Sequence, residues 1–74
     1  MSITQDQLQL IINSDVEHLV CRLQDDLGLP LDEAFSRVYN SYIYKKLLNV
    51  ATGLYIQSPD YIYDYLREEL STKD

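Results

Sequence analysis

The chain is poor in the side chains that build covalent or metal chemistry. It has one cysteine, Cys21, and one histidine, His18. A single cysteine forms no disulfide within the chain, and zinc or iron sites normally use more than one such ligand. His18 and Cys21 lie three positions apart on an expected helix, but no second soft ligand accompanies them. We therefore expect no internal disulfide, no metal site and no cofactor.

Features that would support catalysis are also missing. With only Gly28 and Gly53, the chain has no glycine-rich loop to hold phosphate. Asp60 and Asp64 lie one helical turn apart on an arc expected to face water, so neither carboxylate has the enclosure that raises a pKa for acid catalysis. A cysteine nucleophile beside His18 would have no evident oxyanion donor. We expect the protein not to be an enzyme; an enzyme subunit completed by oligomerisation is the least favoured alternative.

Long apolar runs and basic charge are scarce as well. The apolar runs are far shorter than the roughly 20 residues that cross a bilayer as a helix, and residues 1–4 lack the basic start of a secretory signal. We expect a cytoplasmic protein with no membrane segment. Six Lys and Arg against twelve Asp and Glu give a net charge of −6. Such a surface repels nucleic acid and anionic lipid and suits a basic protein partner.

What the chain does contain is helical patterning, strongest at the N-terminal end. Thr4 and Gln7 have the spacing of a capping box, and an apolar stripe with helical period follows from Leu8 to Leu27. Ser14 and Glu17 repeat that spacing, yet the stripe continues without a change of phase. The pattern predicts one long helix, ended by Gly28 in a left-handed conformation and by Pro30.

Three further helices are predicted in the rest of the chain. Asp32 and Glu33 suit a first helical turn, and the apolar phase then changes at residues 40–41, where Ser41 is placed to cap a short third helix. Gly53 is a second stop, and residues 54–57 read as an extended connector. Residues 58–60, Ser-Pro-Asp, signal the start of the last helix. The whole chain, residues 1–74, is thus predicted to be a single all-α domain, a small bundle of about four helices.

All seven tyrosines lie between positions 39 and 65. A tyrosine fills a core with its ring and seeks a polar partner with its hydroxyl. Helical spacing assigns four of them mainly to core packing: Tyr39, Tyr42, Tyr61 and Tyr65. The remaining three lie off the apolar stripes and are the predicted partner-binding candidates: Tyr44, Tyr55 and Tyr63.

Two other groups of residues suggest functional surfaces. Ile3, Leu10 and Cys21 lie near one line outside the main stripe of the first helix, which suggests either scattered surface residues or a homodimer face. Arg37, Lys45 and Lys46 are the only local concentration of positive charge, with tyrosines between them. That combination gives an alternative function, a small regulator or toxin that contacts nucleic acid, although the acidic net charge makes nucleic acid an unfavoured partner.

Three segments resemble a family of short, uncharacterised bacterial proteins: residues 31–41, residues 52–55 and residues 58–62. The resemblance covers about the last two thirds of the chain and rests on helix caps and aromatic residues. It implies a family of unknown function whose members are often encoded beside toxin-like genes, so that this chain would be a component associated with a toxin–antitoxin pair. It carries over no catalytic residue. Together with the acidic, tyrosine-rich composition, it favours a non-enzymatic helical module that binds another protein.

Overall fold

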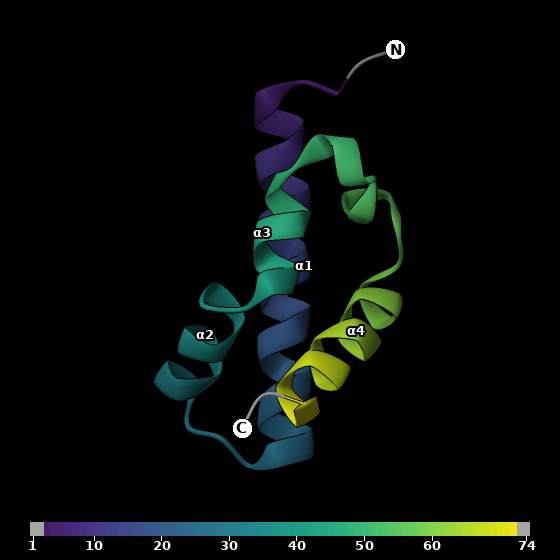
Figure 1. The fold of residues 1–74 in the computed structure, drawn as a ribbon. Helices are drawn as coiled ribbons and strands as arrows, with labels where there is room; N and C mark the ends of the chain where they lie inside the picture. The colour runs from purple at the N-terminus through teal and green to yellow at the C-terminus, as the bar shows by residue number, and fades with distance from the viewer. Residues whose placement is uncertain (1–2, 73–74) are drawn as a thin grey trace.

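The computed structural model describes residues 3–72, which form four α-helices and two short 3₁₀ turns (Figure 1). The elements follow one another as α1 (Gln5–Leu27), α2 (Leu31–Tyr39), α3 (Tyr42–Leu48), η1 (Val50–Thr52), η2 (Leu54–Ile56) and α4 (Pro59–Thr72). Helix α1 is the long central element. Helix α3 lies along its N-terminal half, while α2 and α4 flank its C-terminal half. The predicted all-α bundle of four helices is confirmed.

Both ends of α1 follow their local sequence signals. Thr4 is the N-cap, and its hydroxyl accepts a hydrogen bond from the Gln7 backbone N–H while the Gln7 side chain accepts one from the Thr4 N–H. At the other end, Gly28 takes a φ of 66° and its N–H bonds to the Gln24 carbonyl. Glycine adopts the left-handed backbone conformation at little energetic cost, which is why the helix ends there. The prediction of one uninterrupted helix is confirmed.

The break between α2 and α3 is also where the sequence predicts it. Ser41 precedes α3, and its side chain accepts a hydrogen bond from the Tyr44 backbone N–H. The helix is capped a second time from α4, since the Glu69 carboxylate accepts hydrogen bonds from Tyr42 N at 2.8 Å and from Ile43 N at 3.0 Å. A negative charge is favourable at this end of a helix. The cap therefore ties α3 to α4.

The predicted extended connector at residues 54–57 is wrong, because Leu54–Ile56 form a 3₁₀ turn. Gly53 takes a φ of 68°, and the carbonyls of Gly53 and Leu54 accept hydrogen bonds from Ile56 N and Gln57 N. Two consecutive short turns satisfy the backbone locally. As a result Leu54 and Tyr55 fold back onto the core instead of alternating between two faces.

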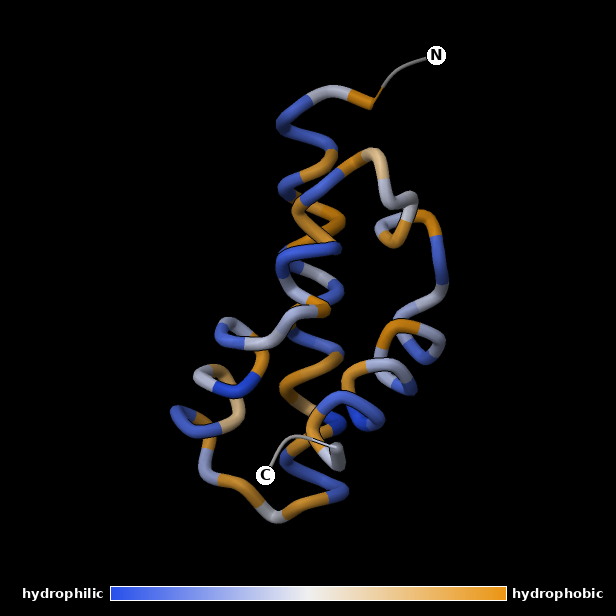
Figure 2. The backbone as a smooth tube through the Cα atoms, in the orientation of Figure 1, coloured by the Kyte–Doolittle hydropathy of each residue, from blue (hydrophilic) through white to orange (hydrophobic). Residues whose placement is uncertain are grey.

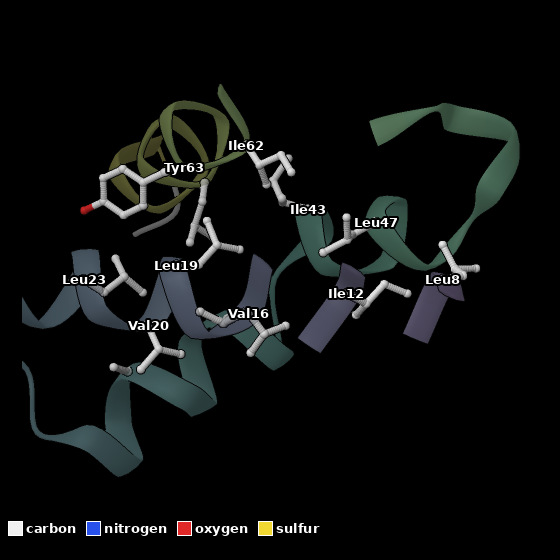
Figure 3. Packing of buried hydrophobic residues seen from close by; sticks show 13 residues of the cluster. Leu8, Ile12, Val16, Leu19, Val20, Leu23, Ile43, Leu47, Ile62 and Tyr63 are labelled. Carbon is white, nitrogen blue, oxygen red and sulfur yellow. The ribbon is translucent and has the colours of Figure 1, made fainter. Parts of the chain in front are cut away.

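The core lies where the apolar sides of α1, α3 and α4 meet (Figures 2 and 3). Figure 3 shows Ile43 and Leu47 of α3 and Ile62 of α4 among the apolar side chains of α1. Ala34 and Val38 add the inner face of α2 to the same cluster. Within the described residues, no helix combines the length and apolar character needed to span a membrane.

Candidate partner-binding groove

The tyrosines predicted to pack the core are the exposed ones, which corrects the sequence interpretation. Their exposed fractions are 48%, 62%, 44% and 45% for Tyr39, Tyr42, Tyr61 and Tyr65. The reason is that helical spacing places Tyr61 and Tyr65 beside the centre of the α4 apolar face but cannot say which side a neighbouring helix covers. Helix α1 covers the Tyr63 side. Tyr39 and Tyr42 flank the break between α2 and α3, where their rings turn outward.

The three predicted partner-binding candidates are the more buried tyrosines. Tyr63 is a core residue with an exposed fraction of 2%, so its prediction as a surface anchor is corrected. Tyr44 is half-buried and meets the Tyr39 ring edge to face at 5.0 Å between centroids, and Tyr55 packs against the core from η2. Contact of Tyr44 and Tyr55 with a partner stays a prediction.

The exposed tyrosines of α3 and α4 border two adjoining hollows. One, of about 280 Å³, is lined by Ile43, Lys46, Thr52, Leu54, Gln57, Tyr61 and Tyr65. The other, of about 390 Å³, is lined by Tyr42, Ile43, Tyr65, Glu68, Glu69 and Thr72. Because Ile43 and Tyr65 line both, the hollows adjoin each other, and we call them together the α3–α4 groove. Ile43 and Leu54 form its apolar base, and tyrosines form much of its wall.

The tyrosines of the groove are held in defined positions. The Tyr61 and Tyr65 rings meet at 62° with centroids 5.1 Å apart, and their hydroxyls lie 3.2 Å from each other. The hydrogen bond with Tyr65 raises the pKa of the Tyr61 hydroxyl. On α3, the Lys46 ammonium lies 5.2 Å from the centre of the Tyr42 ring. A cation over an aromatic face is electrostatically favourable.

On the side of α4 that faces α1, a row of polar contacts fixes the position of the helix. Asp60 accepts hydrogen bonds from His18 Nε2 and from Arg22, each at 2.9 Å. The Arg22 guanidinium also lies 4.4 Å from the centre of the Tyr63 ring, whose hydroxyl donates to Asp26 at 2.6 Å. Burial, with the bond to Asp26, raises the pKa of Tyr63. These contacts hold α4 so that Tyr61 and Tyr65 face away from α1.

Asp15 is a polar residue that the sequence interpretation missed. It lies on α1 with an exposed fraction of 5%, and its Oδ2 atom is buried with no hydrogen-bond partner in the described part of the chain. Burial raises the pKa of Asp15 to about 6, and the charge of His18 opposes that rise. The sequence signal that predicts its burial is its angular position on the helix, which is only about 40° from that of the core residue Leu19 at 100° per residue. Burial of the charged Asp15 carboxylate therefore destabilises the folded state at neutral pH.

The remaining sequence-predicted groups are dispersed. Across residues 3–72, no three His, Cys, Asp or Glu side chains lie together in a way that would hold a metal ion. Arg37 is paired with Glu33 at 3.2 Å, whereas Lys45 and Lys46 lie on α3. The basic residues that suggested a nucleic-acid surface thus belong to two helices, and one of them is engaged by an acid.

The predicted homodimer face is only partly present. Ile3 lies before α1, in the position preceding the N-cap, and packs partly against the core. This is the place of the apolar residue in a hydrophobic staple, which accounts for its departure from the predicted face. Leu10, with an exposed fraction of 69%, and Cys21 are exposed on α1. A dimer through these two residues stays a prediction.

Comparison of the chain with protein-family models, with curated proteins and with solved structures finds no match. The resemblance to a bacterial family linked to toxin–antitoxin loci therefore stays a prediction.

Proposed function

We propose that this protein is a non-enzymatic interaction module that binds a basic protein partner in the α3–α4 groove. The observation that carries the proposal is the set of exposed tyrosines around an apolar base: Tyr42, Tyr61 and Tyr65. Tyrosine is enriched among the residues that dominate protein interfaces, because a large ring is desolvated while its hydroxyl keeps a polar contact. A net charge of −6 favours a basic partner through long-range attraction.

Several features make the groove suitable for an interface. It is lined by α3, α4 and the two 3₁₀ turns, Tyr61 and Tyr65 are fixed by ring and hydroxyl contacts with each other, and α4 is anchored to both α1 and α3. A surface ordered before binding loses less conformational entropy in the complex. Binding to a component of a toxin–antitoxin pair is the biological setting that the sequence resemblance suggests, and the identity of the neighbouring gene tests it.

Affinity capture from the native host tests the proposal when a groove variant is compared with a matched control. The groove variant is Tyr61→Ala with Tyr65→Ala, and the control is Tyr39→Ala, since Tyr39 is similarly exposed but does not line the groove. We expect mass spectrometry to find a protein retained by the wild type and by Tyr39→Ala but lost from the groove variant. Equal recovery by all three forms would contradict the proposal, and so would retention of only RNA or DNA that nuclease removes.

A further inference from the structure

The hollow beside Tyr42 and Tyr65 combines aromatic rings with carboxylates. Its lining contains those two tyrosines together with Glu68 and Glu69. Glu69 is committed to the backbone N–H groups at the start of α3. Glu68 is exposed and, among the described residues, takes part in no ion pair. The hollow therefore offers one available carboxylate beside two ring systems.

We propose that this hollow receives an arginine side chain of the basic partner, an inference that rests on the proposed function and names the group recognised. A guanidinium is planar, stacks on an aromatic ring and presents a fork of N–H donors that matches a carboxylate. In the hollow it stacks on the ring of Tyr65 or Tyr42 and donates to Glu68. The partner's arginine is thus bound by ring and charge together.

The chain itself contains an example of a guanidinium bound by a tyrosine ring and a carboxylate. Arg22 lies over the Tyr63 ring at 4.4 Å and donates to the Asp60 carboxylate at 2.9 Å, so a guanidinium is held between a tyrosine and an acid within this fold. Lys46, which lines the adjoining hollow, lies over the Tyr42 ring. The ammonium shows that this ring accepts a cation, and it competes with an incoming arginine for the same ring. Removal of the Lys46 charge is therefore expected to strengthen binding.

Titration of the ¹⁵N-labelled full chain with N-acetyl-arginine amide tests the inference by NMR. We expect chemical-shift changes centred on Tyr42, Tyr65 and Glu68, with none of comparable size from N-acetyl-citrulline amide, which has nearly the same shape but no charge. N-acetyl-lysine amide is expected to bind more weakly because it lacks the planar fork. Glu68→Gln should weaken arginine binding about fivefold, and Lys46→Gln should strengthen it about threefold.

The outcomes separate this inference from the proposed function. Shifts spread evenly over the acidic surface, or an affinity unchanged by Glu68→Gln, would overturn the arginine site even if the groove variant loses its captured partner. If the arginine probe binds as expected but the groove variant retains the partner, the arginine site stands as a local property and the proposed function fails. Circular dichroism of each variant establishes that the fold is intact before binding is compared.

Discussion

At the scale of single residues, the tyrosines illustrate how one residue type serves two purposes in a small domain. Tyr63 is buried with its hydroxyl bonded to Asp26, while Tyr61 and Tyr65 bond to each other and face the groove. Helical spacing places Ile62 and Leu66 at the centre of the α4 core face, with Tyr61 and Tyr65 on one side of it and Tyr63 on the other. Spacing alone does not say which of these sides another helix covers. The approach of α1 distinguishes them, and that approach is a tertiary property.

Replacement of the Tyr63 hydroxyl should cost stability. Tyr63→Phe removes the hydrogen bond to Asp26 and leaves that carboxylate with one partner fewer, so we expect the free energy of unfolding to fall by about 1–2 kcal/mol. Tyr65→Phe, which alters an exposed hydroxyl, is the matched control and should change it by less than about 0.5 kcal/mol. Urea denaturation measures both. Equal losses of stability in the two variants would contradict a stabilising hydrogen bond between the Tyr63 hydroxyl and Asp26.

Asp15 makes stability depend on pH in a defined direction. Its pKa is about 6 in the folded chain against an ordinary 3.8, so between these values the folded state binds more protons at this site than the unfolded state. The free energy of unfolding therefore falls as pH rises through this window. Above pH 6 the full cost of the buried charge is present.

Asp15→Asn should remove that cost. At pH 7.5 we expect the variant to be more stable than the wild type by about 1–2 kcal/mol, and the gain should shrink as pH approaches 4. Asp25→Asn, at an exposed position of the same helix, is the control. Both changes are also compared in a His18→Gln background, because the charge of His18 opposes the rise in the pKa of Asp15. Thermal unfolding across pH measures the effect, and a gain that does not depend on pH would refute the assignment to Asp15.

At the scale of elements, the sequence specified helix ends better than helix neighbours. The capping box at Thr4, the left-handed Gly28 and the Ser41 cap are local features, and each is present as predicted. The second cap on α3 comes from Glu69, 27 positions after Tyr42, and no local sequence pattern predicts it. The 3₁₀ turns around Gly53 were likewise missed because alternating side chains resemble an extended segment. The groove combines α3, α4 and these turns, so it was not predictable from any one of them.

Loss of the Glu69 cap should loosen α3 specifically. Glu69→Gln removes a charge that accepts two backbone N–H groups at the helix start, and we expect about 1 kcal/mol of lost stability. Hydrogen exchange at Tyr42 and Ile43 should be accelerated relative to the wild type, and this acceleration should be larger than any in the middle of α1. Glu68→Gln, one position away and without this contact, should leave these rates unchanged. Uniform acceleration across the chain would contradict a local tie between α3 and α4.

At the scale of the whole molecule, the two long sides of α1 present different surfaces. One side carries α4 and the groove, while Leu10 and Cys21 are exposed outside the packed face. A domain of this size gains from association, because a small chain buries little core. If Leu10 and Cys21 form a homodimer face, Leu10→Lys should shift a micromolar sample from dimer to monomer in sedimentation velocity. A wild-type protein that sediments as a monomer would contradict the dimer.

The central claim is that the α3–α4 groove is the binding surface, and calorimetric titration with the captured partner tests it most directly. The groove variant, Tyr61→Ala with Tyr65→Ala, should bind at least about 30-fold more weakly than the wild type, as expected for the loss of central aromatic anchors. Tyr39→Ala should stay within about threefold of the wild-type Kd. A groove variant that binds as tightly as the wild type, or a Tyr39→Ala variant that loses as much affinity as the groove variant, would contradict the account.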